Sequence, residues 1–258
     1  MNSELSINIL FPVLNERLRL QSGIERTMDY LSKNITIPYQ LTILDNGSTD
    51  ETPQIAQMLQ EKYKEVLYVR MEERGVGVAF RRGILENKSE VVGYMDVDLS
   101  TDLKYLGRAI DLFRNHPELE YVNGSRFSKN SDTRGRKWYR KITSAGLVFL
   151  LKACFQMKAT DAVCGFTFLR KSSAERLVAA CGDEKGWFYT IEFLLRAERM
   201  NMNIYDMPVE WQEDYNTTVN VWKTIWNYLF QICRLKKVFA EEKKIAMLQE
   251  RTNNVKED

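Results

Sequence analysis

Two aspartates that stand one residue apart are the residues of this chain best suited to bind a metal ion. Asp96 and Asp98 follow the apolar run Val91–Met95, which predicts a buried strand, so their carboxylates leave the strand end on opposite faces. One carboxylate can ligate Mg²⁺ or Mn²⁺, with substrate phosphates completing the coordination shell, while the other orients a ribose hydroxyl or a water molecule. Ordinary acidic turns share this spacing, so the pair by itself leaves both interpretations open.

A basic segment between residues 125 and 141 predicts an anion-binding site. Arg126 and Arg140 each present a planar guanidinium group that can donate two hydrogen bonds to phosphate oxygens. Ser144 lies four residues after Arg140, so on a helix the two side chains meet the same ligand. A solvated basic loop is the alternative. The other basic residues of the segment are Arg134, Arg136, Lys137 and Lys141.

The elements that position these residues alternate between strand and helix in the first part of the chain. Such units predict an α/β fold, with a mostly parallel sheet and helices on both faces. Polar clusters at 15–16, 45–50 and 96–98 fall at the carboxyl ends of predicted strands, where parallel sheets bind ligands. Strands are predicted at 7–13, 39–44, 65–69 and 91–95, and helices at 17–32, after 49–53 and at 78–86.

The second half of the chain is less regular and ends in an amphipathic segment. Residues 219–239 place aromatic and apolar side chains at helical spacing with basic residues among them, which predicts a helix lying in a membrane interface. Packing on the domain's own core or in a dimer is the alternative. The segment's apolar residues are Trp222, Ile225, Trp226, Leu229, Phe230, Ile232 and Cys233, and its basic residues are Lys223, Arg234, Lys236 and Lys237. Other predicted elements are strands at 120–124 and 204–209 and helices at 144–155 and 187–200.

These patterns predict one domain over residues 1–215, then the amphipathic helix at 216–240 and a charged, solvated tail at 241–258. Composition limits the class of protein. With 37 basic and 35 acidic residues the net charge is only +2, which argues against a nucleic-acid partner. Four cysteines without a CxxC pair, together with one histidine, give too few ligands for a zinc site. The start of the chain predicts no signal peptide, and the longest apolar run, 145–151, is too short to span a membrane. We therefore expect a protein of the cytoplasm, peripheral on the cytosolic face of a membrane.

Taken in order, the motifs resemble glycosyltransferase family 2, and most closely the dolichyl- and polyprenyl-phosphate glucosyl- and mannosyltransferases. The resemblance covers residues 5 to 215. It is carried by Pro12-Val13-Leu14-Asn15-Glu16, by Asp45-Asn46-Gly47-Ser48-Thr49-Asp50-Glu51-Thr52, by Arg74-Gly75-Val76-Gly77 with Arg82-Gly83, by Tyr94-Met95-Asp96-Val97-Asp98, by Gly124-Ser125-Arg126, by Arg140-Lys141-Ile142-Thr143-Ser144 and by Asp161-Ala162-Val163-Cys164-Gly165-Phe166.

The resemblance implies a GT-A fold, a nucleotide-sugar donor, a Mg²⁺ or Mn²⁺ ion and inversion at the anomeric carbon. In the donor site Asp45 would contact the base, with Ser48 and Asp50 supporting its loop. Asp96 would face the ribose and diphosphate, and Asp98 would hold the metal, so that the two form the metal site. Many relatives have a lysine where this chain has Val76, and Arg74, Arg81 or Arg82 would compensate. The residues assigned to the nucleotide site are Pro12, Asn15, Glu16, Asp45, Ser48, Asp50, Gly75, Arg82 and Asp96.

The resemblance also assigns the acceptor side. Arg126, Arg140 and Ser144 would bind an acceptor phosphate, which is already ionised and needs no general base. Glu192 and Asp161 would hold a sugar hydroxyl or an arginine, or act as base toward a hydroxyl acceptor. A structural role is the alternative for both. The expected reaction is transfer of a hexose from UDP-glucose, or from GDP-mannose, to a polyprenyl or dolichyl phosphate. A hydroxyl of a growing glycan is the alternative acceptor, and a non-catalytic sugar-nucleotide or lipid-binding module is disfavoured because the acid pair and basic segment are both present.

Overall fold

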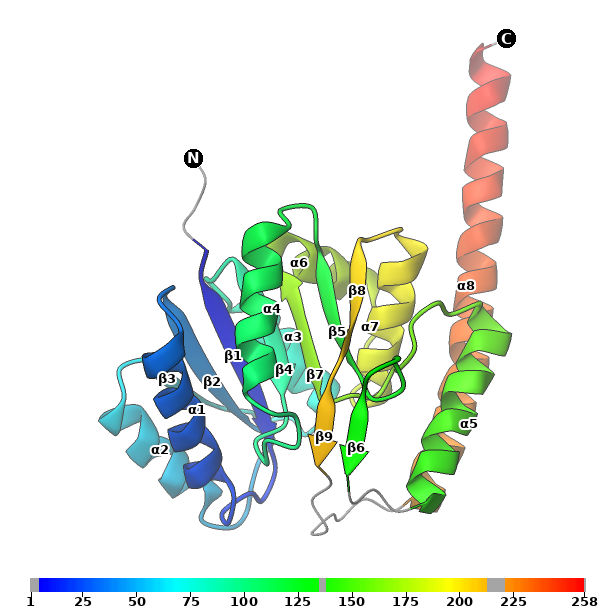
Figure 1. Cartoon of the computed structure of the whole chain (residues 1–258). Helices are drawn as coiled ribbons and strands as arrows, with labels where there is room; N and C mark the ends of the chain where they lie inside the picture. Colours follow the sequence, from blue (N-terminus) through cyan, green and yellow to red (C-terminus); the bar gives the residue numbers. More distant parts are fainter. Residues whose placement is uncertain (1–4, 135–137, 213–220, 258) are drawn as a thin grey trace.

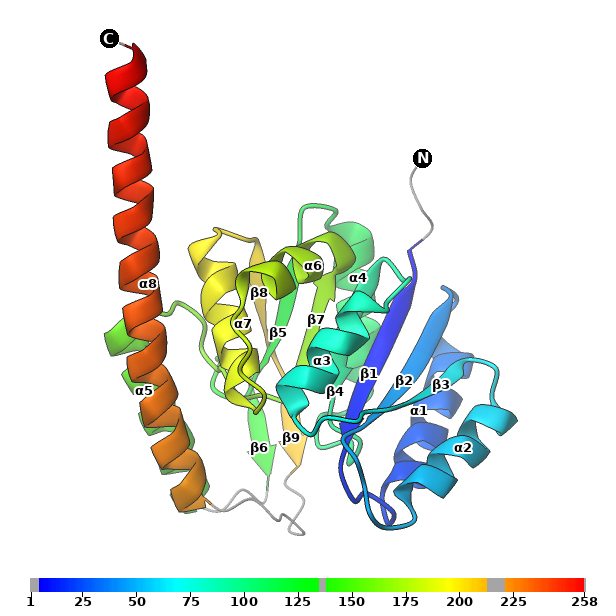
Figure 2. The ribbon, with the colours of Figure 1, turned by 180° about the vertical axis from the view of Figure 1, so that it is seen from behind.

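A seven-stranded sheet flanked by helices forms the centre of the molecule (Figures 1 and 2). The structure is a computed structural model, and it describes residues 5–134, 138–212 and 221–257. The predicted α/β fold is confirmed. The strands of the large sheet are β1 Ile7–Val13, β2 Tyr39–Asp45, β3 Val66–Arg70, β4 Val91–Met95, β5 Tyr121–Ser125, β7 Phe166–Arg170 and β8 Ile204–Pro208, and a small sheet pairs β6 Asp132–Arg134 with β9 Glu210–Gln212. The helices are α1 Leu20–Asn34, α2 Thr52–Lys62, α3 Val76–Leu85, α4 Lys104–Asn115, α5 Trp138–Phe155, α6 Lys171–Ala180, α7 Phe188–Arg199 and α8 Val221–Glu257.

The order of strands in the large sheet is β3-β2-β1-β4-β7-β5-β8. Strands β3, β2, β1 and β4 are parallel, as predicted, so their carboxyl ends meet at one edge. Strand β7 runs antiparallel to both neighbours, β4 and β5. This reversal places the residues just before β7 beside the carboxyl end of β4, where Asp96 and Asp98 begin.

Two hydrophobic cores cover the two faces of the sheet, and successive side chains of β1 point alternately into one core and the other. Ile9 and Phe11 pack against α1, α2 and α4, while Leu10, between them, packs against α3 and α7 on the other face. Figure 2 shows α3, α6 and α7 together on this second face. Both faces of the central strands are buried, which accounts for their continuous apolar runs.

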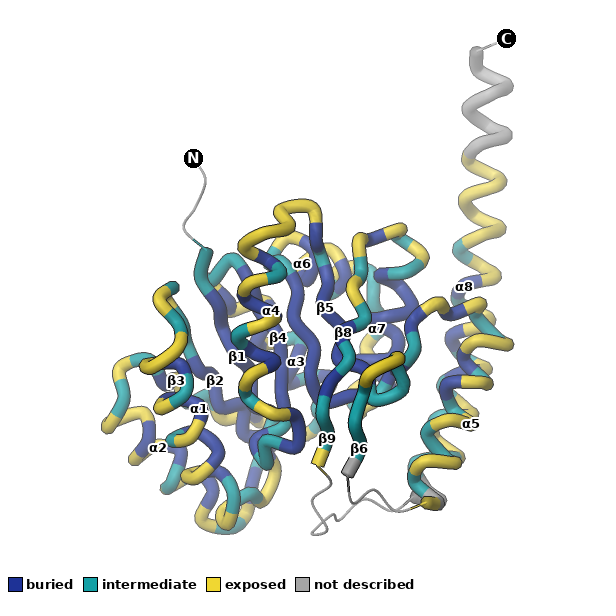
Figure 3. The backbone as a smooth tube through the Cα atoms, viewed as in Figure 1, coloured by how far each residue is buried: buried dark blue, intermediate teal, exposed yellow. Residues whose placement is uncertain are grey.

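Helix α8 packs beside α5 and α7 and continues past the domain (Figures 1 and 3). Ile232, Leu235 and Phe239 are buried in the second core, whereas described side chains between 240 and 249 are almost all exposed. The predicted end of this helix near Phe239 is wrong, because the backbone stays helical to Glu257. Glu, Lys, Ala, Met, Leu and Gln follow Phe239, and all favour helix.

Parts of the basic segment and of the amphipathic segment lie outside the described residues. Arg136, Lys137 and residues 216–220 are not described, and for Arg134, Trp222 and Lys223 only the backbone is. Among the helices that the structure describes, none combines the length and the apolar content needed to cross a bilayer.

Candidate active site

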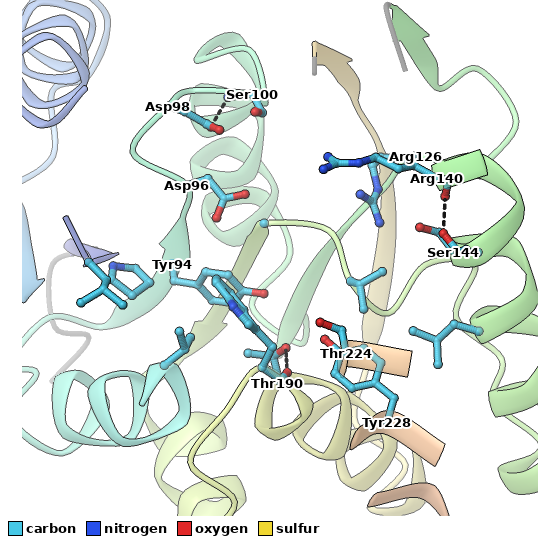
Figure 4. A pocket seen from close by; sticks show the side chains of 18 of the residues that line it. Tyr94, Asp96, Asp98, Ser100, Arg126, Arg140, Ser144, Thr190, Thr224 and Tyr228 are labelled. Atoms are coloured by element: carbon cyan, nitrogen blue, oxygen red, sulfur yellow. Dashed lines mark hydrogen bonds between the residues drawn. The ribbon is translucent and has the colours of Figure 1, made fainter. Parts of the chain in front are cut away.

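A cavity of about 860 Å³ opens where the carboxyl ends of β1 and β4 face helices α5, α7 and α8 (Figure 4). One wall comes from the first half of the chain, from the loops after β1 and β4 and the start of α3. The other comes from the second half, mainly from α5 and α8. The predicted site residues that line it are Pro12, Glu16, Gly75, Asp96, Asp98, Arg126, Arg140 and Ser144.

Asp96 and Asp98 supply the acidic wall of this cavity. The Ser100 amide donates a hydrogen bond of 2.9 Å to Oδ1 of Asp98, which fixes that carboxylate at the turn after β4. Burial raises the pKa of Asp96 to about 7, and the neighbouring charge of Asp98 adds to the rise, while Arg126 opposes it. A nearby divalent cation would favour the ionised form of Asp96.

The donor set fits a Mg²⁺ or Mn²⁺ ion that binds together with a diphosphate. Asp96 and Asp98 offer hard oxygen ligands, and the described residues contain no cluster of three or more His, Cys, Asp or Glu side chains that could hold a metal. Mg²⁺ is characteristically held by one or two carboxylates, with water and substrate phosphates in the remaining positions. The chain therefore provides part of a coordination shell and leaves the rest to the ligand.

Gly165 is a residue of this site that sequence reasoning missed. A Cβ atom added to Gly165 would overlap Oδ2 of Asp96, and the Asp96 amide donates a hydrogen bond of 3.2 Å to the Gly165 carbonyl. Only glycine leaves room for the aspartate at this point. Its place in the motif before β7 marked Gly165 as part of the resemblance but did not show that it adjoins Asp96.

Arg126 lies in the cavity wall and is held there by Asp161. Its Nε donates to Oδ2 of Asp161 at 2.7 Å and its Nη2 to Oδ1 at 3.0 Å, and the guanidinium carbon lies 5.0 Å from the centre of the Trp211 ring. The backbone amides of Arg126 and Val163 donate to the same carboxylate. Asp161 is fully buried and is not among the described lining residues, so of its predicted roles the structure agrees with that of holding an arginine and not with that of a base or sugar ligand. It positions Arg126.

Glu192 is also buried away from the cavity and pairs with arginines, so of its predicted roles the structure agrees with that of holding an arginine and not with contact to the sugar or action as base. It accepts hydrogen bonds from the Gly182 amide at 3.0 Å, from Nε of Arg196 at 2.9 Å and from Nη2 of Arg234 at 2.6 Å. Burial alone would raise the pKa of Glu192, but these donors together lower it below the ordinary value. Glu192 therefore stays charged and faces two arginines.

The predicted nucleotide loops are hydrogen-bonded to each other beside the cavity. Asp45 is buried and accepts from the Ser48 amide at 2.8 Å and the Tyr68 hydroxyl at 3.0 Å. The Asn15 amide donates to Oγ of Ser48 at 2.9 Å, and Asp50 accepts from the Thr52 amide at the start of α2. Asn15, Asp45, Ser48 and Asp50 are not among the lining residues, so in this structure they join the loops after β1 and β2.

Basic residues on the donor side differ from those predicted. Arg82 is exposed on α3, pairs with Glu86 at 2.8 Å and does not line the cavity. Of the predicted compensating arginines Arg74 lines it, and Arg19, which was not predicted, lines it as well. Arg74 donates to the Gly47 carbonyl at 3.1 Å, which keeps its charge next to the position of Val76. Arg19 donates to the carboxylate of Glu16 at 2.6 and 2.8 Å, so it lies in the cavity wall as half of an ion pair.

The opposite wall is apolar except for a few polar groups. Arg140 and Ser144 come from α5, and Figure 4 shows Arg126 and Arg140 across the cavity from Asp96 and Asp98. The described lining residues of α5, α7 and α8 include no carboxylate. The part that α8 plays in this wall was not predicted. The other residues that these helices contribute are Thr143, Gly146, Leu147, Leu150, Thr190, Thr224, Ile225, Tyr228, Leu229 and Ile232.

Comparison with known proteins gives the family. The model of glycosyl transferase family 2 matches residues 8–178. Glycosyltransferase AglD of Haloferax volcanii is 25% identical over 233 residues, covering 89% of this chain but only 37% of that protein. A dolichyl-phosphate beta-glucosyltransferase of Dictyostelium discoideum is 25% identical over 252 residues, covering 89% of this chain and 77% of the relative.

A solved structure agrees on the fold. Glucosyl-3-phosphoglycerate synthase from Mycobacterium tuberculosis, in complex with Mn²⁺, UDP and glucosyl-3-phosphoglycerate, superposes with a TM-score of 0.65 at 17% identity, over 90% of this chain and 80% of that one. The expected GT-A fold is confirmed by this likeness. The family model, these relatives and the ordered motifs thus agree: the chain belongs to glycosyltransferase family 2 and is a nucleotide-sugar-dependent glycosyltransferase.

Proposed function

We propose that this enzyme transfers glucose from UDP-glucose to the phosphate of a polyprenyl phosphate at the cytosolic surface of a membrane. The Dictyostelium relative is named a dolichyl-phosphate beta-glucosyltransferase, and the solved structure of similar fold contains Mn²⁺ and UDP. GDP-mannose is the alternative donor. The observation that carries the proposal is the composition of the wall formed by α5, α7 and α8, which is basic and apolar.

A phosphate acceptor matches the charges on this wall. A phosphate monoester is ionised at neutral pH, so it needs cations that position it rather than a base that removes its proton. Arg140 lines the wall, and Asp161 holds the Arg126 guanidinium at its edge. A hydroxyl acceptor would need a base, but the two predicted candidates, Asp161 and Glu192, are buried against arginines.

A lipid acceptor and a membrane surface match the apolar side chains. Leu147, Leu150 and Ile225 line the cavity, so part of an isoprenoid chain can leave water there. Further along the same helices, large side chains are exposed. They are Trp138, Ile142 and Phe149 on α5 and Trp226 and Phe230 on α8, and aromatic residues of this kind beside basic ones favour a lipid interface. The four cysteines are all unpaired, which agrees with a reducing compartment.

The proposed chemistry is one displacement. An acceptor phosphate oxygen forms a bond to the anomeric carbon while the bond from that carbon to the β-phosphate oxygen breaks, and the electron pair leaves with UDP. Attack opposite the leaving group inverts the anomeric centre. Arg126 and Arg140 bind and orient the attacking phosphate, and Asp96 and Asp98 hold the divalent cation. When bound, that cation supplies positive charge that stabilises the departing diphosphate.

Transfer of radiolabelled sugar tests the proposal. The purified chain is incubated with Mg²⁺ or Mn²⁺ and either UDP-[¹⁴C]glucose or GDP-[¹⁴C]mannose, with and without undecaprenyl or dolichyl phosphate in detergent. We expect label in the organic phase only with UDP-glucose and only with the lipid phosphate. UDP release without a labelled lipid would contradict the acceptor and support a hydroxyl, and label from GDP-mannose would contradict the donor.

A further inference from the structure

Helix α8 is attached to the domain through a group of ion-paired side chains that the proposed chemistry does not use. This group, the α7–α8 clamp, consists of Glu192, Arg196, Arg234 and Glu242. Glu192 and Arg196 come from α7, and Arg234 and Glu242 come from α8. Because α8 also lines the acceptor wall of the cavity, the clamp joins a buried part of the domain to the substrate site.

Glu192 is the centre of the clamp. One of its oxygens accepts from Arg196 and from the Gly182 amide, and the other accepts from Arg234 at 2.6 Å. Arg196 then donates from Nη1 to Glu242 at 2.9 Å, so α8 is held at two points two turns apart. The guanidinium carbons of Arg196 and Arg199 lie 5.1 and 4.0 Å from the centre of the Phe239 ring, between those two points.

The clamp fixes the register of α8 against α7, which apolar packing alone does not specify. Ile232 and Leu235 contribute most to burial of α8, but hydrophobic contact is non-directional. Buried ion pairs often add little net stability over apolar packing, and their best-attested use is to specify one register of helix packing. The side chains of Glu192 and Arg196 are 0% and 8% exposed, so water does not replace their partners easily.

Helix α8 connects the clamp to the cavity, so a shift of the helix at one end also shifts it at the other. Arg234 lies six residues from Tyr228, or about 9 Å along the helix axis. Tyr228 lines the cavity, and its ring meets Phe188 of α7 edge-on at 5.7 Å between centroids. A shift of α8 at the clamp therefore moves Tyr228 and Ile225, which face the bound acceptor.

We propose that Glu192 is a positioning residue for the lipid-phosphate acceptor, which sets the register of α8 and hence the shape of the acceptor wall. This inference rests on the proposed function, because it concerns the acceptor of that reaction. It predicts that loss of Glu192 weakens acceptor binding and leaves donor binding unchanged. Most lining residues on the side of Asp96 and Asp98 come from the first half of the chain, and no clamp residue is among them.

The test compares Glu192→Gln with wild type and with a matched control, Glu25→Gln. Glu25 also pairs with a basic side chain, Lys62 at 2.7 Å, but on α1 and α2, away from α8. Calorimetry measures binding of citronellyl phosphate, a short prenyl phosphate, and of UDP with Mn²⁺. Hydrogen exchange measures protection of amides 224–242. Arg234→Gln serves as a second variant that leaves Glu192 paired with Arg196.

We expect citronellyl phosphate to bind Glu192→Gln about tenfold more weakly or worse, since small displacements in a site cause losses of this size or larger. UDP affinity should stay within about twofold, and amides 224–242 should exchange faster. Arg234→Gln should change the same quantities in the same direction, and Glu25→Gln none of them. Unchanged exchange in α8, or equal weakening of UDP and citronellyl phosphate, would overturn the inference. Failure of wild type to bind citronellyl phosphate would instead overturn the proposed acceptor, and with it this role of Glu192.

Discussion

Asp161, Glu192, Asp96 and Asp98 are buried or half-buried carboxylates in or near the cavity, and their partners divide them into two kinds. Asp161 and Glu192 each face guanidinium groups and have no surface on the cavity, so they hold other residues in place. Asp96 and Asp98 line the cavity, where Asp98 accepts from the Ser100 amide and its charge raises the pKa of Asp96. Carboxylates of the second kind are the ones that a cation and a diphosphate can reach.

The first prediction at this scale concerns the metal. Asp98→Ala removes one of two carboxylates that fit the ion, so metal-dependent turnover should fall to below about a hundredth of wild type. Radiolabelled transfer at saturating UDP-glucose measures the loss. Wild-type activity that persists with excess chelator would contradict the assignment, and Asp111→Asn, an exposed acid of α4, is the control.

A second prediction concerns the acceptor phosphate. Arg140→Ala removes a charged hydrogen-bond donor from the α5 wall, and the acceptor KM should rise about tenfold or more. Binding of UDP with Mn²⁺, measured by calorimetry, should be unchanged. An equal loss of donor and acceptor binding would show that Arg140 does not act on the acceptor alone.

The third prediction concerns Gly165. In Gly165→Ala the added methyl group meets the Asp96 carboxylate, which must turn away from its present place. Mn²⁺ affinity in the presence of UDP, followed by electron paramagnetic resonance, should fall about tenfold without loss of the folded state. Gly146→Ala is the control, because a methyl group there meets no neighbouring atom within 4 Å.

At the scale of the elements, β1 to β4 and their helices could be predicted from sequence, because both faces of these strands are buried and their apolar runs end at turn residues. Strand β7 and helix α6 were not predicted. The motif 161–166 overlaps the first residue of β7, so no boundary in the sequence separates the strand from the motif. The acid pair and the basic arginines were found from residue type. The Arg126 partner of Asp161 and the Arg234 partner of Glu192 lie 35 and 42 residues away in sequence, so only the fold reveals those two ion pairs. The Arg196 partner of Glu192 lies only four residues away, at helical spacing.

Helices α5 and α8 carry the prediction that belongs to this scale. Trp226 and Phe230 are exposed on one side of α8, and replacing both with glutamate removes apolar surface and adds repulsion from anionic lipid. Affinity for vesicles of phosphatidylglycerol and phosphatidylcholine, measured by flotation, should fall at least about tenfold. Leu85→Glu, an equally exposed position at the end of α3, should have little effect. Equal vesicle binding by wild type, the double variant and Leu85→Glu would contradict a membrane role for α8.

At the scale of the whole molecule, the α7–α8 clamp makes stability depend on pH. The pKa of Glu192 is lowered in the folded protein, so its contribution is fully present above the unfolded value of about 4.3 and is lost as pH falls through the folded value. The difference in free energy of unfolding between wild type and Glu192→Gln should be constant from about pH 7 to pH 5.5. It should narrow below about pH 4. Urea unfolding at each pH measures it, and a constant difference down to about pH 3 would contradict the lowered pKa.

The two walls of the cavity come from different halves of the chain, and this has a consequence for how such an enzyme can diversify. The lining residues proposed to face the donor follow strands of the parallel sheet, whereas α5 and α8, proposed to face the acceptor, lie outside the sheet. Selection can therefore alter acceptor choice without disturbing nucleotide recognition. A chimera that receives α5 and α8 from a relative is the smallest exchange expected to give this scaffold a new acceptor.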